Sequence, residues 1–299
     1  MRPSENPKIP EGINASSEHP LKEFALLLVA IGGFVIVLVV TLSIMAEMFA
    51  GYVPFSWEKK LTASFEGQDQ QELSIEELPE EQALLHGVEF AIKELGEALV
   101  PHADLPEEMQ LTFHLMDEGV PNAFATLGGH IFVTTGLLSA LESENGLAMV
   151  MAHEIAHIKD RHPVKALSRG ALIQLVLSVT VGSQDSAALQ AVLGNTGLLT
   201  LMSFNRDMER DADSAALLTL ERKYGHVVGA DEFFVKMSQQ IMSPEWQSFF
   251  QTHPHTDSRI ENIESKMSSG SISKPLIPLD PRIQKYLDAS SEKTDENSS

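Results

Sequence analysis

The sequence predicts an α+β protein, in which a mainly helical domain with a small β-sheet follows one transmembrane helix. Three observations lead to this prediction. An uncharged apolar run occupies Phe24–Met45, and three short segments between residues 110 and 133 have the side-chain pattern of strands. Apolar or small residues recur at helical spacing in three other stretches, at 84–95, 147–158 and 209–216.

The apolar run Phe24–Met45 is about the length that crosses a bilayer as a helix. A cleaved signal peptide would have a shorter apolar region, about 7–15 residues, and a stronger cationic flank than Lys22 beside Glu23. A core helix that is apolar all round would need a larger protein to bury it. We therefore expect residues 1–23 to form an N-terminal tail and residues 24–46 to be a transmembrane anchor in the lipid bilayer.

The cations around this run favour one orientation. Three precede it and two follow it, namely Arg2, Lys8 and Lys22, then Lys59 and Lys60. Because cytoplasmic flanks carry the excess of Lys and Arg, we expect a short cytoplasmic N-terminus and a domain on the outer face. In a bacterium this is a single-pass protein of the inner membrane whose domain faces the periplasm.

The remaining boundaries follow from composition. The segment after the anchor is polar, which predicts a linker over residues 47–78. The folded domain is expected over residues 79–267. The last segment, 268–299, is rich in Ser, Lys, Asp, Glu and Pro, so we expect a largely disordered tail in which Pro281–Leu287 could dock.

Within the domain, Pro79–Leu99 has the apolar spacing of a helix, and Gln110–Met116 alternates as a strand does. Two more strands are expected at Asn122–Ala125 and Ile131–Val133.

Two later apolar stretches, Ala171–Gly182 and Ala187–Phe204, are respectively too short and too polar for a further span. We expect them to form core helices or helices that rest on the bilayer surface.

Composition excludes several kinds of binding partner and of chemical site. The formal charge of -21 disfavours nucleic acid and anionic lipid as partners. The chain has no cysteine, which excludes disulfides, thiolate metal sites and cysteine nucleophiles.

The sequence His153-Glu154-Ile155-Ala156-His157 lies in an apolar helical stretch. Two histidines four residues apart are separated by about 400° around a helix, so they project from nearly one face and can bind one cation. Glu154 can then reach a water molecule held by that cation. A surface helix that carries these residues by chance is the alternative, but unpaired buried imidazoles would be unfavourable in so apolar a helix.

A catalytic zinc needs a third protein ligand. His162 is excluded if the helix continues, because it would lie about 140° from His157. Downstream, Glu209 and Asp213 share a helical face with small residues, as expected where a helix packs closely on the metal helix. Glu209 would be the ligand, and Asp213 would accept the second-nitrogen proton of a ligand histidine. The alternative is a solvated charged face paired with Arg206 and Arg210.

Four segments occur in the order found in the zinc endopeptidases related to the CAAX prenyl protease and HtpX. They are Asn122–Ala125 with Gly128–Leu138, HEIAH followed by Arg161-His162, Glu209-x-x-Ala212-Asp213, and His253–Ile260. The chain resembles this family over about residues 80–265. It departs from the family at Leu127, where proline is common, and at His130, where an aromatic is common.

The resemblance implies a zincin-type domain with one Zn²⁺ per chain, held by His153, His157 and Glu209. Glu154 would be the general base, His253 an oxyanion donor, and Arg259 a partner of Asp213. Asn122 and the strand through Ile131, Phe132 and Val133 would bind substrate as an added β-strand.

Such an enzyme would cleave extended or unfolded polypeptides, so we expect a membrane-anchored quality-control endopeptidase. Two alternatives stay open: a zinc-binding, chaperone-like membrane protein without turnover, and a processing protease for one partner. The sequence does not predict an oligomeric state.

Overall fold

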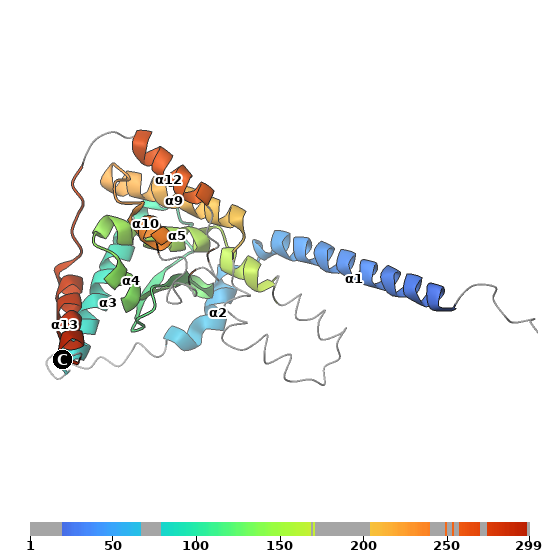
Figure 1. Ribbon diagram of the computed structural model, residues 1–299, viewed down its shortest axis with the longest axis horizontal. Coiled ribbons are helices and arrows are strands. Elements are labelled where there is room, and N and C mark those ends of the chain that lie inside the picture. The colour runs from blue at the N-terminus through green and yellow to red at the C-terminus, as the bar shows by residue number, and fades with distance from the viewer. Residues whose placement is uncertain are drawn as a thin grey trace, which may run out of the picture.

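The computed structural model describes residues 20–66, 79–168, 170, 204–239, 249, 253, 257–269 and 274–297. A long helix, α1, projects from a body in which helices surround a small sheet (Figure 1). The predicted α+β class is therefore confirmed. Of the two apolar stretches expected between the metal helix and Glu209, residues 171–203 lie outside the described residues.

Helix α1 (Pro20–Ala50) contains the predicted anchor at 24–46. Its apolar part, Leu21–Ala50, has 30 residues, and the most apolar 18-residue window within it has a mean hydropathy of 3.0 and no buried residue. About 20 residues suffice to cross a bilayer. The helix is therefore compatible with a single membrane span.

The prediction of a linker over residues 47–78 is wrong for helix α2 (Phe55–Glu66). Phe55, Glu58 and Thr62 lie on one face of α2, at helical spacing, and all three are buried against the body. A linker was expected because this segment is polar. The helix docks mainly through polar contacts, which an apolar pattern does not reveal.

Helix α2 packs against a double glycine, Gly128-Gly129, in the short turn η3 (Leu127–Gly129). Gly128 has φ +77 and Gly129 has φ +90, in the left-handed region that favours glycine. A Cβ on Gly128 would lie 2.2 Å from Oγ1 of Thr62. These two residues therefore allow the turn and α2 to approach closely.

The sheet contains the strands β1 (Thr112–Met116), β2 (Ala123–Ala125) and β3 (His130–Thr134). All three strands were predicted, and β1 begins two residues later than the expected Gln110. The order is β1-β3-β2, with β1 parallel and β2 antiparallel to β3.

This strand order corrects one prediction. Ile131, Phe132 and Val133 lie on the central strand, and both of its edges are paired with neighbours. They therefore cannot add a substrate strand. Among the described strands, β2 and β1 are the edge strands, and β2 is the one that contacts helix α5.

Helix α5 (Glu144–Lys159) is the centre of the body, because every residue from Asn145 to Ile158 is buried. The Ser143 hydroxyl caps its first turn by accepting a hydrogen bond from the Gly146 amide. Helix α9 (Arg206–Tyr224) packs along α5, and Asn205 caps it in the same way.

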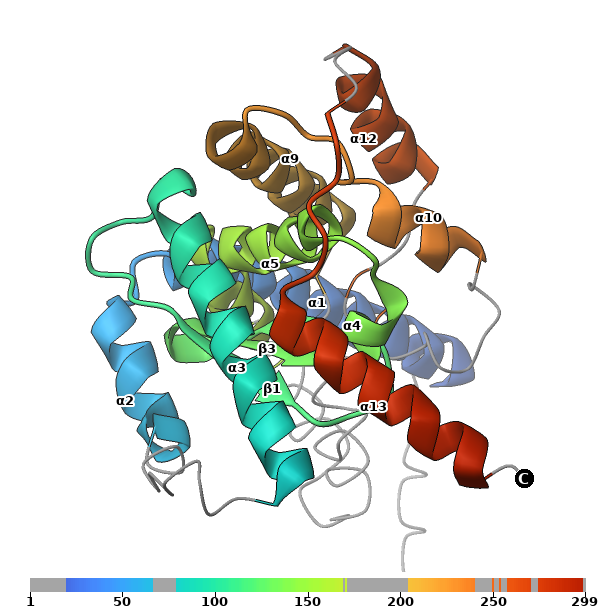
Figure 2. The same cartoon turned by 90° about the vertical axis from the view of Figure 1, so that its left-hand side faces the viewer.

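The other elements enclose these two helices and the sheet (Figures 1 and 2). Helix α3 packs against β1 and α5, and α10 and α12 lie against α5 and α9 respectively. Their bounds are α3 Glu80–Leu99, η2 Val100–His102, α4 Thr135–Ala140, α10 Glu232–Gln239 and α12 Asp257–Ser269.

The prediction of a largely disordered tail over 268–299 is wrong for helix α13 (Pro281–Asn297), which lies against α3 (Figure 2). Ile283 is buried there, and Arg282 lies over the Phe90 ring of α3, 5.6 Å from its centroid. The docking considered for Pro281–Leu287 does take place. The few apolar residues of a polar segment are enough to bind it to the body.

We predict that Gly96→Ala destabilises the fold, because a Cβ on Gly96 of α3 would lie 2.6 Å from ring atoms of buried Phe113 on β1. Overpacking of this kind costs about 1–3 kcal/mol. The control is Gly87→Ala on the same helix, where the nearest atom is 3.8 Å away. It should be neutral or gain about 0.5–1 kcal/mol of helix stability. Thermal unfolding of the full chain in detergent should give a lower Tm only for Gly96→Ala, and equal values would contradict this packing.

Candidate metal centre

The motif His153-Glu154-x-x-His157 lies inside the protein. All three side chains are on the buried helix α5, and Glu154 and His157 are fully buried. Helix α9 brings Glu209 and Asp213 against them, and both are also buried. Ala212 and Ala216, on the same face of α9, have no exposed surface, so small side chains let the two helices approach closely.

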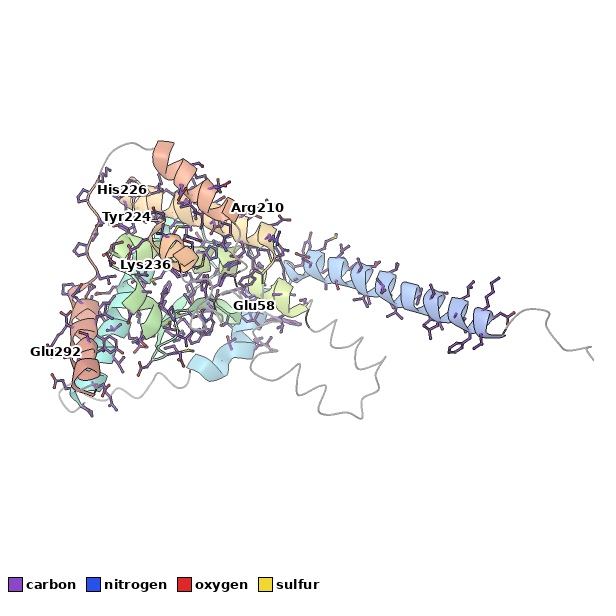
Figure 3. The ribbon with its side chains drawn as sticks, in the orientation of Figure 1. Glu58, Arg210, Tyr224, His226, Lys236 and Glu292 are labelled. Carbon is purple, nitrogen blue, oxygen red and sulfur yellow. The ribbon has the colours of Figure 1, made fainter. Side chains whose placement is uncertain are left out.

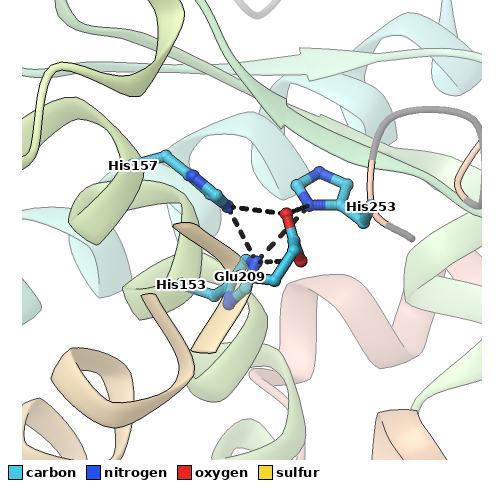
Figure 4. Close-up of side chains that lie close together, drawn as sticks. All are labelled: His153, His157, Glu209 and His253. Atoms are coloured by element: carbon cyan, nitrogen blue, oxygen red, sulfur yellow. Dashed lines mark hydrogen bonds and ion pairs between the residues drawn. The ribbon is translucent and has the colours of Figure 1, made fainter. Parts of the chain in front are cut away.

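Four side chains form one cluster, whose ligand atoms all lie within 4.8 Å of one another: His153, His157, Glu209 and His253. Figure 4 shows them turned towards a common centre. The Nε2 atoms of the first two histidines are 2.9 Å apart, and each is 3.4 Å from a carboxylate oxygen of Glu209. The structure therefore brings the three predicted ligands together.

The donor set and its spacing fit zinc. With bonds of roughly 2.0–2.1 Å, the corners of a tetrahedral zinc site lie about 3.3 Å apart. The 2.9–3.4 Å separations among His153, His157 and Glu209 are close to this value. Neutral imidazole and carboxylate are ligands that zinc prefers.

The outer nitrogen of His153 has a partner as well. Its Nδ1 is 3.0 Å from Oδ1 of Asp213, an ion-pair contact that favours a proton on Nδ1 and leaves Nε2 to face the cluster with its lone pair when a metal binds. Arg259 holds Asp213 through two hydrogen bonds of 2.7 and 2.8 Å. Its Nη1 is also 2.7 Å from Oε2 of Glu209, a contact that spacing did not predict.

His162 lies outside the four-residue cluster, but the reason given for excluding it is wrong. Helix α5 ends at Lys159, and Arg161 has φ +61, so the chain turns sharply without a glycine. This turn places Nδ1 of His162 2.8 Å from Nδ1 of His157. His162 thus contacts the predicted ligand His157 at Nδ1, the ring nitrogen that does not face the cluster. Sequence analysis did not predict this contact.

Carboxylates determine the charge of the cluster. Burial disfavours an imidazolium at His153, but hydrogen bonds to Asp213 and Glu209 outweigh it and raise its pKa to about 10. Burial would raise the pKa of Glu209, but the surrounding histidines hold it well below its usual range. The site therefore stabilises positive charge, which a metal cation can supply in place of a proton.

His157 responds differently. Burial, reinforced by the charge of His153, lowers its pKa well below the usual range, so its imidazole is neutral. The ring of Phe204 stacks on it, with centroids 4.0 Å apart. Phe204 stands at the end of an apolar stretch, just before the cap of α9, and no local pattern predicts its contact with a ligand.

Glu154 lies beside the cluster, and neither of its carboxylate oxygens makes a hydrogen bond of good geometry with the described residues. Burial raises its pKa, while nearby His253 and His153 and the Ala125 backbone act in the opposite direction. A carboxylate whose protonated form is stabilised in this way suits a group that takes up a proton and later returns it.

His253 is fully buried, and it contacts both the predicted ligand Glu209 and the predicted base Glu154. Its Nδ1 is 3.1 Å from Glu209 Oε1, and its Nε2 is 3.5 Å from Glu154 Oε1. The Phe249 ring stacks against it, 4.7 Å away. Its Nδ1 therefore belongs to the metal cluster, while its Nε2 faces the base.

The predicted substrate residues lie in or beside the sheet. Asn122 precedes β2, and its backbone N–H donates a 2.8 Å hydrogen bond to the Thr134 hydroxyl. The part of the sheet that reaches the site is Ala125, through its backbone beside Glu154.

Comparison with known proteins agrees with this geometry. The sequence pattern of peptidase family M48 matches residues 89–267. The chain is 29% identical over 169 residues to the mitochondrial metalloendopeptidase OMA1 of Schizosaccharomyces pombe, covering 56% of this chain and 50% of that protein. It is 29% identical over 188 residues to the beta-barrel assembly-enhancing protease of Escherichia coli, covering 58% and 38% respectively. It therefore spans half or less of the length of these relatives.

We predict that Glu209→Gln and Asp213→Asn weaken zinc binding to different degrees. Loss of a group that only orients a ligand typically costs about 10–100-fold in affinity. Asp213→Asn should fall within that range, and Glu209→Gln should exceed it because a ligand charge is removed. The control is Asp211→Asn, an exposed carboxylate on the same helix. Chelator competition measures all three, and wild-type affinity in Glu209→Gln would show that Glu209 is not a ligand.

Proposed function

Because the chain belongs to peptidase family M48, we propose that it is a membrane-anchored zinc endopeptidase that hydrolyses peptide bonds of unfolded or damaged proteins. The observation that carries this proposal is the buried cluster of His153, His157 and Glu209 with Glu154 beside it. One Zn²⁺ per chain would be held by the two histidines and Glu209. The metalloendopeptidase names of the relatives support the same reaction class.

In the proposed reaction, a zinc ion held by His153, His157 and Glu209 would supply a Lewis acid that polarises the peptide carbonyl and lowers the pKa of a water molecule towards about 7. Glu154 accepts the proton of the attacking water and later passes it to the departing amine. Its burial supports this role, since it stabilises the protonated carboxyl between the two transfers. His253, with its Nε2 facing Glu154, would donate to the developing oxyanion.

Asp213 and Arg259 would hold the metal ligands His153 and Glu209 in position. Asp213 fixes the His153 tautomer, and Arg259 contacts both Asp213 and Glu209. Together they link the two ligands on different helices, α5 and α9, through one guanidinium.

Substrate would bind as an extended chain along β2 rather than β3. β2 is an edge strand among the described strands, and the backbone of its last residue, Ala125, lies beside Glu154. Pairing along an edge reads the backbone of a substrate rather than its sequence. Asn122, immediately before β2, would lie beside one end of the bound chain. Backbone recognition favours unfolded or damaged chains, which expose unpaired backbone, as substrates.

Placement in the bacterial inner membrane, with the catalytic domain in the periplasm, is part of the proposal. Helix α1 supports an anchor, and the Escherichia coli relative is named for β-barrel assembly, which concerns proteins of the outer membrane. A processing protease for one partner is the second candidate, because the name of the Escherichia coli relative refers to a single process, β-barrel assembly.

We predict that the full chain in detergent cleaves casein and that Glu154→Gln lowers the rate by about 10²–10⁴-fold, because the general base is lost. Zinc content should be unchanged, since Glu154 lies outside the four-residue cluster. The exposed Glu142→Gln is the control.

Two results would count against this proposal. Zinc without turnover in the parent would favour a chaperone-like protein that binds zinc. Cleavage of only one member in a panel of folded and unfolded proteins would favour a processing protease.

We predict that a reporter active only outside the cytoplasm gives signal when fused after Ser299. The physical reason is the excess of cations before α1, which retains the N-terminal side in the cytoplasm. A second fusion that fluoresces only in the cytoplasm is the matched control. Signal from that fusion alone would place the domain in the cytoplasm and refute the orientation.

A further inference from the structure

Helix α2 contacts the turn that follows helix α5, which carries His153 and His157. Oε1 of Glu58 is 2.6 Å from Nη2 of Arg161, and the same guanidinium nitrogen donates a 2.5 Å hydrogen bond to the Val53 carbonyl. The guanidinium also lies 5.5 Å from the centroid of the Phe55 ring. Three residues within or just before α2 therefore hold one arginine. Figure 3 labels Glu58 where α2 meets the body.

Arg161 needs such support because its backbone has φ +61. A residue with a Cβ in the left-handed region is strained, and such a conformation persists only where its surroundings enforce it. Glu58 is itself held from a second side, since the Gly128 amide donates a 3.2 Å hydrogen bond to its Oε2. The ion pair is nearly excluded from solvent, so water does not screen it.

The turn determines where the next residue points. His162 is buried, and its Nδ1 lies 2.8 Å from Nδ1 of His157. For Nε2 of His157 to face the cluster as a lone pair, Nδ1 must carry the ring proton and donate it. His162 is then the acceptor. This role requires the ring of His162 to be neutral.

We propose that Glu58 is a positioning residue for the metal centre: it holds Arg161 in the left-handed turn, so that His162 orients His157 for zinc. The inference rests on the proposed function. Arg161 also contacts the Val53 carbonyl, which lies between the last residue of α1, Ala50, and the first residue of α2, Phe55. The proposal therefore couples the metal centre to the segment that joins α1 to the body. A change in how α2 sits on the body would thereby alter zinc affinity.

The test measures zinc affinity of the full chain in detergent by chelator competition. Glu58→Gln and His162→Phe should each weaken binding by about 10–100-fold, the range found when an orienting partner of a ligand is lost. If Glu58 acts through His162, the double variant should be no weaker than His162→Phe alone. Arg161→Lys keeps the positive charge but loses the guanidinium that contacts both Glu58 and Val53, so it should weaken zinc binding as Glu58→Gln does. It replaces Glu58→Gln in the test if that variant fails to fold.

Two controls separate this role from general stability. Thr62→Val removes the 3.2 Å contact between α2 and His130 but leaves the ion pair of Glu58 intact. Lys60→Gln removes an exposed charge from the same helix. Both should bind zinc as the parent does. The visible spectrum of bound Co²⁺ should change in Glu58→Gln and His162→Phe but not in these controls.

The outcomes distinguish the two proposals. A parent that binds no zinc would refute the proposed function. Parental affinity in both Glu58→Gln and Arg161→Lys, with a parent that does bind zinc, would overturn only the role of Glu58. So would additive losses in the double variant, or an equal loss in Thr62→Val.

Discussion

The structure depends on charge compensation in the interface between α5 and α9. Three histidines and three carboxylates, together with Arg259, are buried there: His153, His157, His253, Glu154, Glu209 and Asp213. None of these groups can be buried alone without a large penalty. Each therefore has to face a group of opposite charge or a hydrogen-bond partner, and a metal cation would satisfy the three predicted ligands among them, His153, His157 and Glu209. The packing of the two helices and the chemistry of the site are thus one constraint.

Parts of this arrangement can be read from the sequence because they depend on a single helix. The spacing of His153 and His157 places both on one face of α5, and Glu209 and Asp213 share a face of α9 for the same reason. Helical periodicity therefore predicted which residues meet. It could not predict His253, because 44 residues separate it from Glu209 and only tertiary packing unites them.

Other features could not be predicted because no local pattern encodes them. The alternation of side chains identifies strands but not their order, so the edge position of β2 and the central position of β3 emerged only from the structure. The left-handed turn at Arg161 lacks the usual glycine, since contacts with α2 impose it. Helices α2 and α13 dock through a few buried residues in polar segments that composition alone marks as linker and tail.

The most direct test of the account is zinc K-edge X-ray absorption on the full chain in detergent. One zinc per chain, with nitrogen and oxygen donors at about 2.0–2.1 Å and scattering from imidazole rings, is the result that the cluster of His153, His157 and Glu209 predicts. The absence of tightly bound zinc, or a six-oxygen shell without imidazole scattering, would contradict it. In that case the buried charges of α5 and α9 would compensate one another without a metal.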